Sequence, residues 1–229
     1  SDGEEITEDG AEEIVEDVGE SVTEIDQEAE DFPGFSDSES EDFVAEEDID
    51  GETDSETQVF ADETGIVESG KCGDNLTYTI TGDDANGYTL TISGTGKMYD
   101  YYKGNLAPWY SKRANLIDVV VEEHVTNIGS YAFSDCNKLV SIILPESITS
   151  IDGSAFYCCK NLKNVVIPKN VTRIGAFAFA NCEALVSIIV PDEVSSIGEY
   201  TFYNCKNLMS IKLSEKITAI KMSTFEMCS

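Results

Sequence analysis

A repeat of 23 residues constrains this chain more than any other feature of its sequence. Phenylalanine recurs five times at that interval, and a cysteine follows each phenylalanine by three residues. The two columns are Phe133, Phe156, Phe179, Phe202 and Phe225, and Cys136, Cys159, Cys182, Cys205 and Cys228. Leucine, isoleucine and valine fill further columns at the same interval. Because one such unit cannot bury its own apolar face, the repeat predicts a solenoid of stacked coils.

Each unit predicts a short strand that ends at a proline. In residues 139–144, which read LVSIIL, alternation places Ile142 and Leu144 on one face of a strand. Pro145 follows, at a position where its missing N–H removes no hydrogen bond from a sheet. Stacking of the units therefore predicts one parallel strand per coil.

The rest of each unit predicts a second extended segment and a helical turn. Residues 171–175, VTRIG, indicate extended backbone closed by Gly175, a residue suited to a turn with positive φ. In residues 176–185 the Phe, Cys and Leu columns follow one another at intervals of three, which predicts one or two helical turns over the strands. The predicted fold class is α/β, a β-rich solenoid of right-handed coils with a parallel strand in each.

The units resemble the BspA-like leucine-rich repeats of secreted and surface proteins from gut and oral bacteria and some protists. The resemblance rests on VTNIGSYAFSDCNKLVSIILP, VTRIGAFAFANCEALVSIIVP and VSSIGEYTFYNCKNLMSIKL, and with the preceding stretch it covers residues 71–229. Departures are Asp152 and Lys221, where glycine is expected, and Ser214, where proline is expected. Membership implies binding and adhesion at a cell surface, with no catalytic motif.

Residues 70–115 are expected to form a β-rich N-terminal cap that precedes the solenoid of residues 116–229. The alternating stretches LTYTI, residues 76–80, and YTLTIS, residues 88–93, flank a turn-forming stretch and predict a β-hairpin. This part, with APWY after it, resembles the cap of clostridial members of the family.

The end of the cap predicts a degenerate first coil. Residues 109–116 align with residues 132–139, so that Tyr110 occupies the Phe column and Arg113 replaces the cysteine. A terminal coil with altered chemistry is what a solenoid needs, because its open edge must be covered.

Residues 1–69 are predicted to be an acidic, disordered segment. Residues 1–70 hold 29 of the chain's 45 acidic residues and no Lys or Arg, which leaves a formal charge of −2 for the remainder. No apolar stripe persists there, and such a segment cannot bury enough apolar surface to offset the entropy of ordering its backbone. The charge disfavours nucleic acid as a partner, because phosphate binding needs a basic footprint.

The stretch EEDIDG within this segment raises the alternative of a calcium loop. Glu46, Asp48, Asp50 and Gly51 match positions one, three, five and six of an EF-hand, but position twelve falls on Thr57, where a bidentate carboxylate is needed. Diffuse cation condensation is favoured over a formed site, and neither a metal nor a cofactor is expected.

The cysteine column predicts buried free thiols. Parallel strands lie about 4.8 Å apart, a spacing that permits disulfides, but free cysteine is among the most buried residue types. No CxxC pair or second ligand type accompanies the column, which disfavours zinc. Cys72 and Cys158 lie outside the column and are predicted to be the more reactive thiols.

A secreted or cell-surface location is expected. No stretch approaches eighteen apolar residues, so no membrane insertion is expected. The first ten residues lack the basic and apolar regions of a signal peptide, and the chain is expected to be a mature product after signal-peptide removal. So many unpaired thiols would suit an anaerobic habitat.

The sequence predicts a binding function instead of an enzyme. The single histidine, His124, follows a strand and is expected in a turn or at the surface. Two classes remain open: an adhesin that binds a protein or glycan on a host or neighbouring cell, and a structural spacer that displays other domains.

The outward positions of the strands form the candidate binding surface. An exposed apolar stripe on a sheet favours a protein partner, although β-branched neighbours also stabilise a parallel ladder. The candidate partner-binding residues are Val120, Val140, Ile143, Lys163, Val166, Val186, Ile189, Met209 and Lys212.

The sequence stops within a repeat, at Ser229. Residues 208–213 are then expected to form a last strand with an unpaired edge, which is a template for pairing. We expect the native protein to continue with more coils or a cap, and this chain to self-associate through the open edge.

Overall fold

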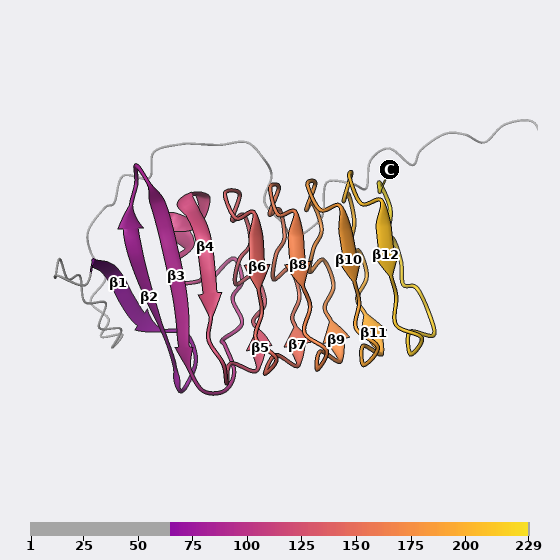
Figure 1. The fold of residues 1–229 in the computed structure, drawn as a ribbon, viewed down its shortest axis with the longest axis horizontal. Coiled ribbons are helices and arrows are strands. Elements are labelled where there is room, and N and C mark those ends of the chain that lie inside the picture. The colour runs from indigo at the N-terminus through magenta and orange to yellow at the C-terminus, as the bar shows by residue number, and fades with distance from the viewer. Residues whose placement is uncertain (1–64, 229) are drawn as a thin grey trace, which may run out of the picture. The chain divides into compact units, whose positions relative to one another are not determined.

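The computed structural model describes residues 65–228, which form a cap followed by a solenoid (Figure 1). The expectations for residues 1–64, including the calcium loop, lie outside the described residues. Strand β1 (Ile66–Lys71) begins close to the start of the described part. The prediction that the disordered segment extends to residue 69 is therefore wrong for residues 66–69, which are strand residues.

A row of front strands runs along the cap and the solenoid (Figure 1). The cap contributes β1, β2 (Leu76–Asp83) and β3 (Gly87–Gly94), which pair antiparallel. The solenoid contributes β4 (Leu116–Val121), β6 (Ser141–Ile143), β8 (Asn164–Val166), β10 (Ser187–Ile189) and β12 (Ser210–Lys212). The strands from β3 to β8 pair in parallel, and β10 pairs in parallel with β12 as a separate sheet. The predicted hairpin and the predicted parallel strand in each coil are confirmed.

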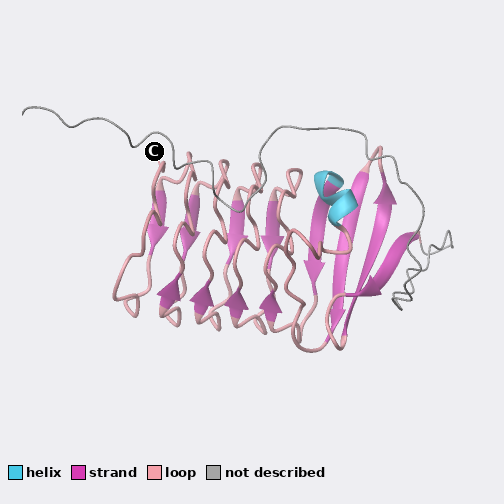
Figure 2. Cartoon of the chain, turned by 180° about the vertical axis from the view of Figure 1, so that it is seen from behind, coloured by secondary structure: helices cyan, strands magenta, loops and turns pink. Residues whose placement is uncertain are grey.

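A second parallel sheet lies behind the front strands. It consists of β5 (Asn127–Ile128), β7 (Ser150–Ile151), β9 (Arg173–Ile174) and β11 (Ser196–Ile197), which confirms the second extended segment of each unit. The 3₁₀ helix η1 (Tyr110–Asn115) is the only helix within residues 65–228, and it lies on this rear side of the cap strands (Figure 2).

The segments that follow the back strands are chains of turns, and the prediction of helical turns there is wrong. Phe177 and Asn181 have φ values of 57° and 59°, which are left-handed values that a right-handed helix cannot contain. The backbone N–H groups of Phe177, Phe179 and Asn181 donate to carbonyl oxygens of the next coil at 3.0, 2.9 and 2.8 Å. These hydrogen bonds join neighbouring coils, whereas those of a helix stay within one segment.

The glycine column exists for a different reason from the one predicted. Gly129, Gly175 and Gly198 do not have positive φ. A Cβ on Gly198 would lie 2.2 Å from the backbone nitrogen of Ala176 in the preceding coil, and a Cβ on Gly175 would meet backbone atoms at 2.6 Å. Close approach of successive coils therefore requires glycine here.

Asp152 replaces glycine in this column and belongs to a buried polar cluster. Its carboxylate accepts a hydrogen bond from Asn127 Nδ2 at 2.8 Å and forms an ion pair with Arg173. Asn127 Oδ1 in turn accepts from the backbone N–H of Met98 at 2.7 Å. Asp152, which departs from the repeat, is thus linked through Asn127 to Met98 of the cap.

Stacked aromatic rings fill the core. The column residues Phe133, Phe156, Phe179 and Phe202 are fully buried, and neighbouring rings of the column, including Phe225, lie 5.3 to 5.7 Å apart. Trp109 extends the stack into the cap, with its ring 6.1 Å from that of Phe133. The prediction that Tyr110 occupies this position is wrong by one residue, because Tyr110 begins η1 and is only partly buried.

We expect a chain that starts at Gly65 to melt within about 2 °C of the full chain, because the deleted residues have no apolar period to add to a core. A chain that starts at Cys72 should melt several degrees lower. It loses β1 and the two bonds of Glu68, to the Tyr78 hydroxyl at 2.9 Å and to Lys112 Nζ at 2.6 Å. Circular dichroism would measure both. A large drop in melting temperature for the chain that starts at Gly65, or no drop for the chain that starts at Cys72, would contradict the prediction that the folded cap begins with β1.

Phe179→Ala should lower the free energy of unfolding by about 3–5 kcal/mol, because it empties a buried position between two stacked rings. The same change at Phe225 should cost much less, since that ring is partly exposed. Urea unfolding of the two variants would measure the difference, and equal losses would argue against a linear stack.

Candidate functional site

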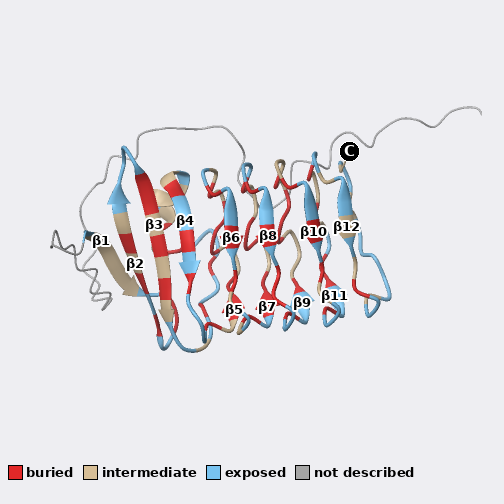
Figure 3. Cartoon of the chain, in the orientation of Figure 1, coloured by how far each residue is buried: buried red, intermediate tan, exposed pale blue. Residues whose placement is uncertain are grey.

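The outward side chains of the front strands form one exposed surface, which we call the front face (Figure 3). Its apolar row consists of Val120, Ile143, Val166 and Ile189, which are 41, 78, 63 and 64% exposed. The strand register places Val120 beside Ile143 and Ile143 beside Val166. In β6, β8 and β10 the middle residue is buried and its two neighbours are exposed. The apolar row therefore adds nothing to the core.

Two further rows lie beside the apolar row. Small polar side chains precede the members of the apolar row by two residues, at Asp118, Ser141, Asn164 and Ser187, and Ser210 stands at the same position before Lys212. Exposed side chains at the starts of the strands are Ile117, Val140, Lys163, Val186 and Met209. Lys212 follows Ile189 in the register of the last two strands. All nine residues predicted as candidate partner-binding residues are thus exposed, within or directly before the front strands.

The front face continues onto the cap, which the sequence analysis missed. Thr79 pairs with Thr91, and Thr91 pairs with Val120, so the apolar row extends as a row of partly exposed hydroxyls. The alternation in LTYTI and YTLTIS was the available signal, because every second residue of each stretch is a threonine or serine.

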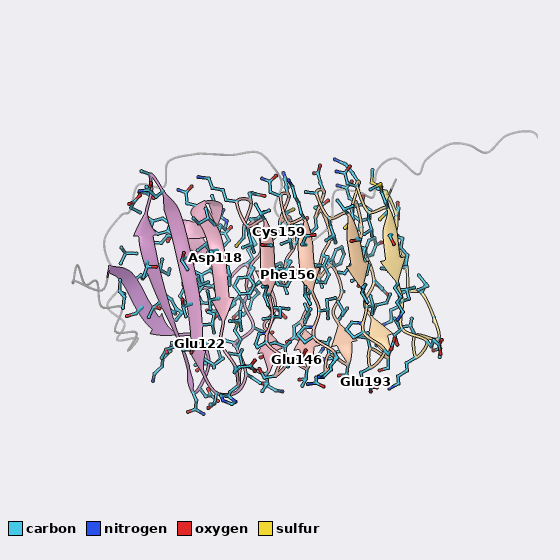
Figure 4. All side chains as sticks on the ribbon, in the orientation of Figure 1. Asp118, Glu122, Glu146, Phe156, Cys159 and Glu193 are labelled. Atoms are coloured by element: carbon cyan, nitrogen blue, oxygen red, sulfur yellow. The ribbon has the colours of Figure 1, made fainter. Side chains whose placement is uncertain are left out.

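Charged groups on the front face are few. Asp118 on β4 and Lys163 before β8 are exposed, and neither has an ion-pair partner among residues 65–228. Lys212 Nζ lies 3.6 Å from a carboxylate oxygen of Asp192. Figure 4 shows Asp118 within the face and the labelled glutamates near its lower border.

Four of the five column cysteines are buried, as predicted, and Cys228 in the last coil is partly exposed. The thiols of the column make hydrogen bonds that explain the residue type. The thiols of Cys159, Cys182, Cys205 and Cys228 lie 3.0 to 3.2 Å from the carbonyl oxygen of the column phenylalanine in the preceding coil. Burial raises the pKa of Cys205 to about 12 and that of Cys159 and Cys182 well above the usual value. All seven cysteines are free.

The two cysteines outside the column differ from each other. Cys72 is fully buried, and burial raises its pKa to about 12, so the prediction of a reactive thiol there is wrong. Cys158 is partly exposed, and its sulfur accepts a hydrogen bond from Asn181 Nδ2 at 3.4 Å. Burial also raises the pKa of Cys158, which disfavours its thiolate.

Other kinds of site find little support within residues 65–228. They contain no group of three or more His, Cys, Asp and Glu side chains that could hold a metal ion. His124 is exposed in a turn with a φ of 79°, and its backbone N–H donates to Ser147 Oγ at 3.1 Å. No helix in this described part has the length and apolar character needed to cross a bilayer.

The raised pKa of Cys205 predicts a loss of stability at high pH. Burial raises this pKa from 9.0 to about 12, so the unfolded chain releases the proton at a lower pH than the folded chain does. The stability contributed by the neutral thiol is complete below pH 9 and is lost as the pH rises toward about 12, with a slope of at most about 1.4 kcal/mol per pH unit.

Cys205→Ala should therefore show a shallower fall in unfolding free energy between about pH 9 and 12, measured with urea. Cys228→Ala is the control, because its thiol is partly exposed and should change the slope less. Identical slopes for the wild type and the Cys205 variant would contradict a buried neutral thiol.

Known proteins resemble this repeat architecture. A leucine-rich repeat protein from Eubacterium ventriosum is 26% identical, with a TM-score of 0.52, over 65% of this chain and 44% of that one. A T. pallidum leucine-rich repeat protein is 26% identical, with a TM-score of 0.54, over 64% and 73%. A leucine-rich cell surface protein from Faecalibacterium prausnitzii is 25% identical, with a TM-score of 0.52, over 65% and 44%. This chain thus spans less than half of the first and third proteins.

No curated protein matches this chain. A family model does match, over residues 109–229, and it describes a BspA type leucine-rich repeat region in six copies. The match begins at residue 109, where the sequence predicts the degenerate first coil. With the 23-residue coils, the buried Phe and Cys columns and this match over more than half of its length, the chain belongs to the BspA-type leucine-rich repeat family.

Proposed function

We propose that this chain is a non-catalytic binding module of a secreted or cell-surface protein, and that it acts in adhesion. Its partner, a protein or a glycan, contacts the front face. The observation that carries the proposal is the apolar row, in which four successive front strands each present a β-branched side chain to solvent.

The exposure of this row supports a binding role because the fold does not need it. Core packing is supplied by the inward residues of the same strands, such as Ile142 and Ile188. Contiguous apolar surface on a soluble protein marks interaction sites. The serine and asparagine side chains beside the row supply hydrogen-bonding groups of the kind found at the rim of protein interfaces.

The comparisons support this location. The F. prausnitzii protein is named as a cell surface protein, and family membership makes a similar location reasonable for this chain. The alternative role, a spacer that displays other domains, would use the same fold but would leave the front face unoccupied.

A variant of the apolar row tests the proposal. Val120→Thr, Val166→Thr and Ile189→Thr together keep β-branched side chains in the strands, so folding should be retained. We expect the triple variant to lose at least about tenfold in affinity for whichever protein or glycan binds the wild type, because it replaces apolar contact area with hydroxyls. Surface plasmon resonance against purified extracellular-matrix proteins, and a glycan array, would supply the binders.

Ile220→Thr with Met222→Thr is the matched control, since it removes exposed apolar side chains outside the front face. This control should bind like the wild type. Equal binding by the triple variant would place the binding site elsewhere, and a wild type that binds nothing on either panel would favour the spacer.

A further inference from the structure

We propose that the front row of the solenoid has a flexible seam between β8 and β10, where the two adjoining coils open and close while their backs stay joined. The seam divides the front face into a part that ends at β8 and a part that begins at β10. The inference rests on the proposed function, because it describes how the surface that meets a partner changes its shape. Strand pairing, a missing hydrogen bond and looser core packing all point to this one junction.

Strand pairing along the front row is interrupted once within residues 65–228. β4 pairs with β6, β6 pairs with β8, and β10 pairs with β12. β8 and β10 are neighbours in the row (Figure 1), but they belong to separate sheets. A parallel ladder fixes the distance between two strands through evenly spaced hydrogen bonds. The described chain lacks that restraint between β8 and β10.

A hydrogen bond that precedes the front strands is interrupted at the same place. The backbone N–H of Lys163 donates to the carbonyl oxygen of Val140 in the preceding coil at 2.8 Å. That of Met209 donates to the carbonyl oxygen of Val186 at 3.0 Å. Val186 occupies the equivalent position between these two donors, but within the described part of the chain its N–H makes no such bond to Lys163. The entry to β10 is therefore not tied to the coil before it.

Core packing at the seam is looser than in the neighbouring coils. The middle residue is an isoleucine in β6, β10 and β12, whereas in β8 it is Val165. Val165 is 8% exposed, and Ile142 and Ile188 on either side of it are each 3% exposed. Val119 of β4 is also a valine, but it too is only 3% exposed. Because a core is affected by the loss of even one methylene group, the smaller side chain weakens packing at this junction.

The back of the same junction is fully joined, so it acts as the hinge. β7, β9 and β11 pair in one continuous parallel sheet behind the front row (Figure 2). In the turns, the N–H groups of Ser154, Phe156 and Cys158 donate to the next coil at 2.8 to 2.9 Å. In the core, the rings of Phe156 and Phe179 stack 5.3 Å apart with an interplanar angle of 5°. Motion at the seam is therefore an opening of the front strands about a closed back.

The seam crosses the apolar row. Val166 of β8 and Ile189 of β10 stand on its two sides, and both are exposed. A partner that contacts both side chains selects one spacing of the two strands from those that already exist. The opening is small, because the Ala184 N–H still donates to the Lys160 carbonyl oxygen at 3.1 Å. A wider opening would also expose inward side chains, at about 25 cal/mol per Å² of apolar surface.

Amide hydrogen exchange of the full chain, followed by NMR, tests the missing bond at the front of the junction. We expect the protection factor of the Val186 amide to be at least about tenfold lower than those of Lys163 and Met209, because a bonded amide exchanges only after its bond opens. These two amides are the matched controls, since they occupy the equivalent positions in the coils before and after. Equal protection of all three would overturn the seam.

Methyl relaxation dispersion tests the motion itself, on the timescale of collective motions. We expect exchange broadening at Val165 and Ile188, the inward residues on the two sides of the seam, and little at Val119 and Ile142. Flat dispersion profiles at Val165 and Ile188, or equal broadening at all four residues, would overturn the motion.

Val165→Ile tests the cause of the motion, because it supplies the residue found at this position in the strands on either side. It should reduce the exchange contribution at Ile188 at least about twofold, since it restores packing at the seam. Val119→Ile is the matched control, because it adds the same methylene group to β4, which has a full ladder with β3. The control should leave Ile188 unchanged. An equal effect of the two substitutions on Ile188 would overturn a motion that originates at the seam.

The seam and the proposed function fail separately, because neither NMR measurement involves a partner. A rigid front row, in a chain whose panel binding is lost in the Val120, Val166 and Ile189 triple variant, would remove the seam and keep the proposed function. A flexible seam, in a chain whose panel binding is unchanged in the triple variant, would keep the seam and remove the proposed binding surface.

Discussion

Backbone hydrogen bonding between successive coils is the interaction on which the rest of this structure depends. Each coil pairs with its neighbours through a back strand, the chain of turns behind the Phe column and, except between β8 and β10, a front strand. Buried backbone groups must be paired, and these ladders supply partners that no single unit could provide for itself. Residues 23 positions apart are therefore held one strand spacing apart.

The inward columns follow from that spacing. Aromatic rings at the same position of successive coils stack at 5.3 to 5.7 Å, and the cysteine beside them donates its thiol proton to a carbonyl of the preceding coil. The same ladders stabilise left-handed residues such as Phe177 and Tyr200, whose backbone conformation costs about 1–2 kcal/mol each for a residue with a Cβ. In the glycine column, Gly129, Gly175 and Gly198 stand where backbone atoms of a neighbouring segment approach too closely for a Cβ.

The outward columns have the same origin, and they connect the fold to the proposed function. Stacking aligns exposed residues into straight rows, so a modest preference for valine and isoleucine at one position becomes an apolar row across four strands. The cap extends the face with threonine hydroxyls in register with that row.

Much of the fold could be predicted from the sequence, because periodicity shows which residues stack. The parallel strand in each coil, the cap hairpin, the buried Phe and Cys columns and the composition of the front face all follow from the 23-residue interval and from alternation. The sequence could not choose between a helical turn and a chain of β-turns in residues 176–185, since both place apolar residues at intervals of three. The hydrogen bonds to the next coil favour the chain of turns, and they are formed only in the stacked structure.

Other details depended on contacts between segments far apart in the chain. Trp109 occupies the aromatic stack in place of Tyr110 because of how η1 joins the cap to the first coil. Asp152 can replace glycine because Asn127 and Arg173 lie beside its carboxylate. The sequence places residues 66–69 in an acidic segment, whereas in the structure Glu68 accepts hydrogen bonds from the Tyr78 hydroxyl and from Lys112. The sequence by itself determined which residues repeat and which of them face inward, because those depend on local period. The tertiary structure decided the backbone conformation of the turns and the partners of the exceptional residues, because those depend on non-local contacts.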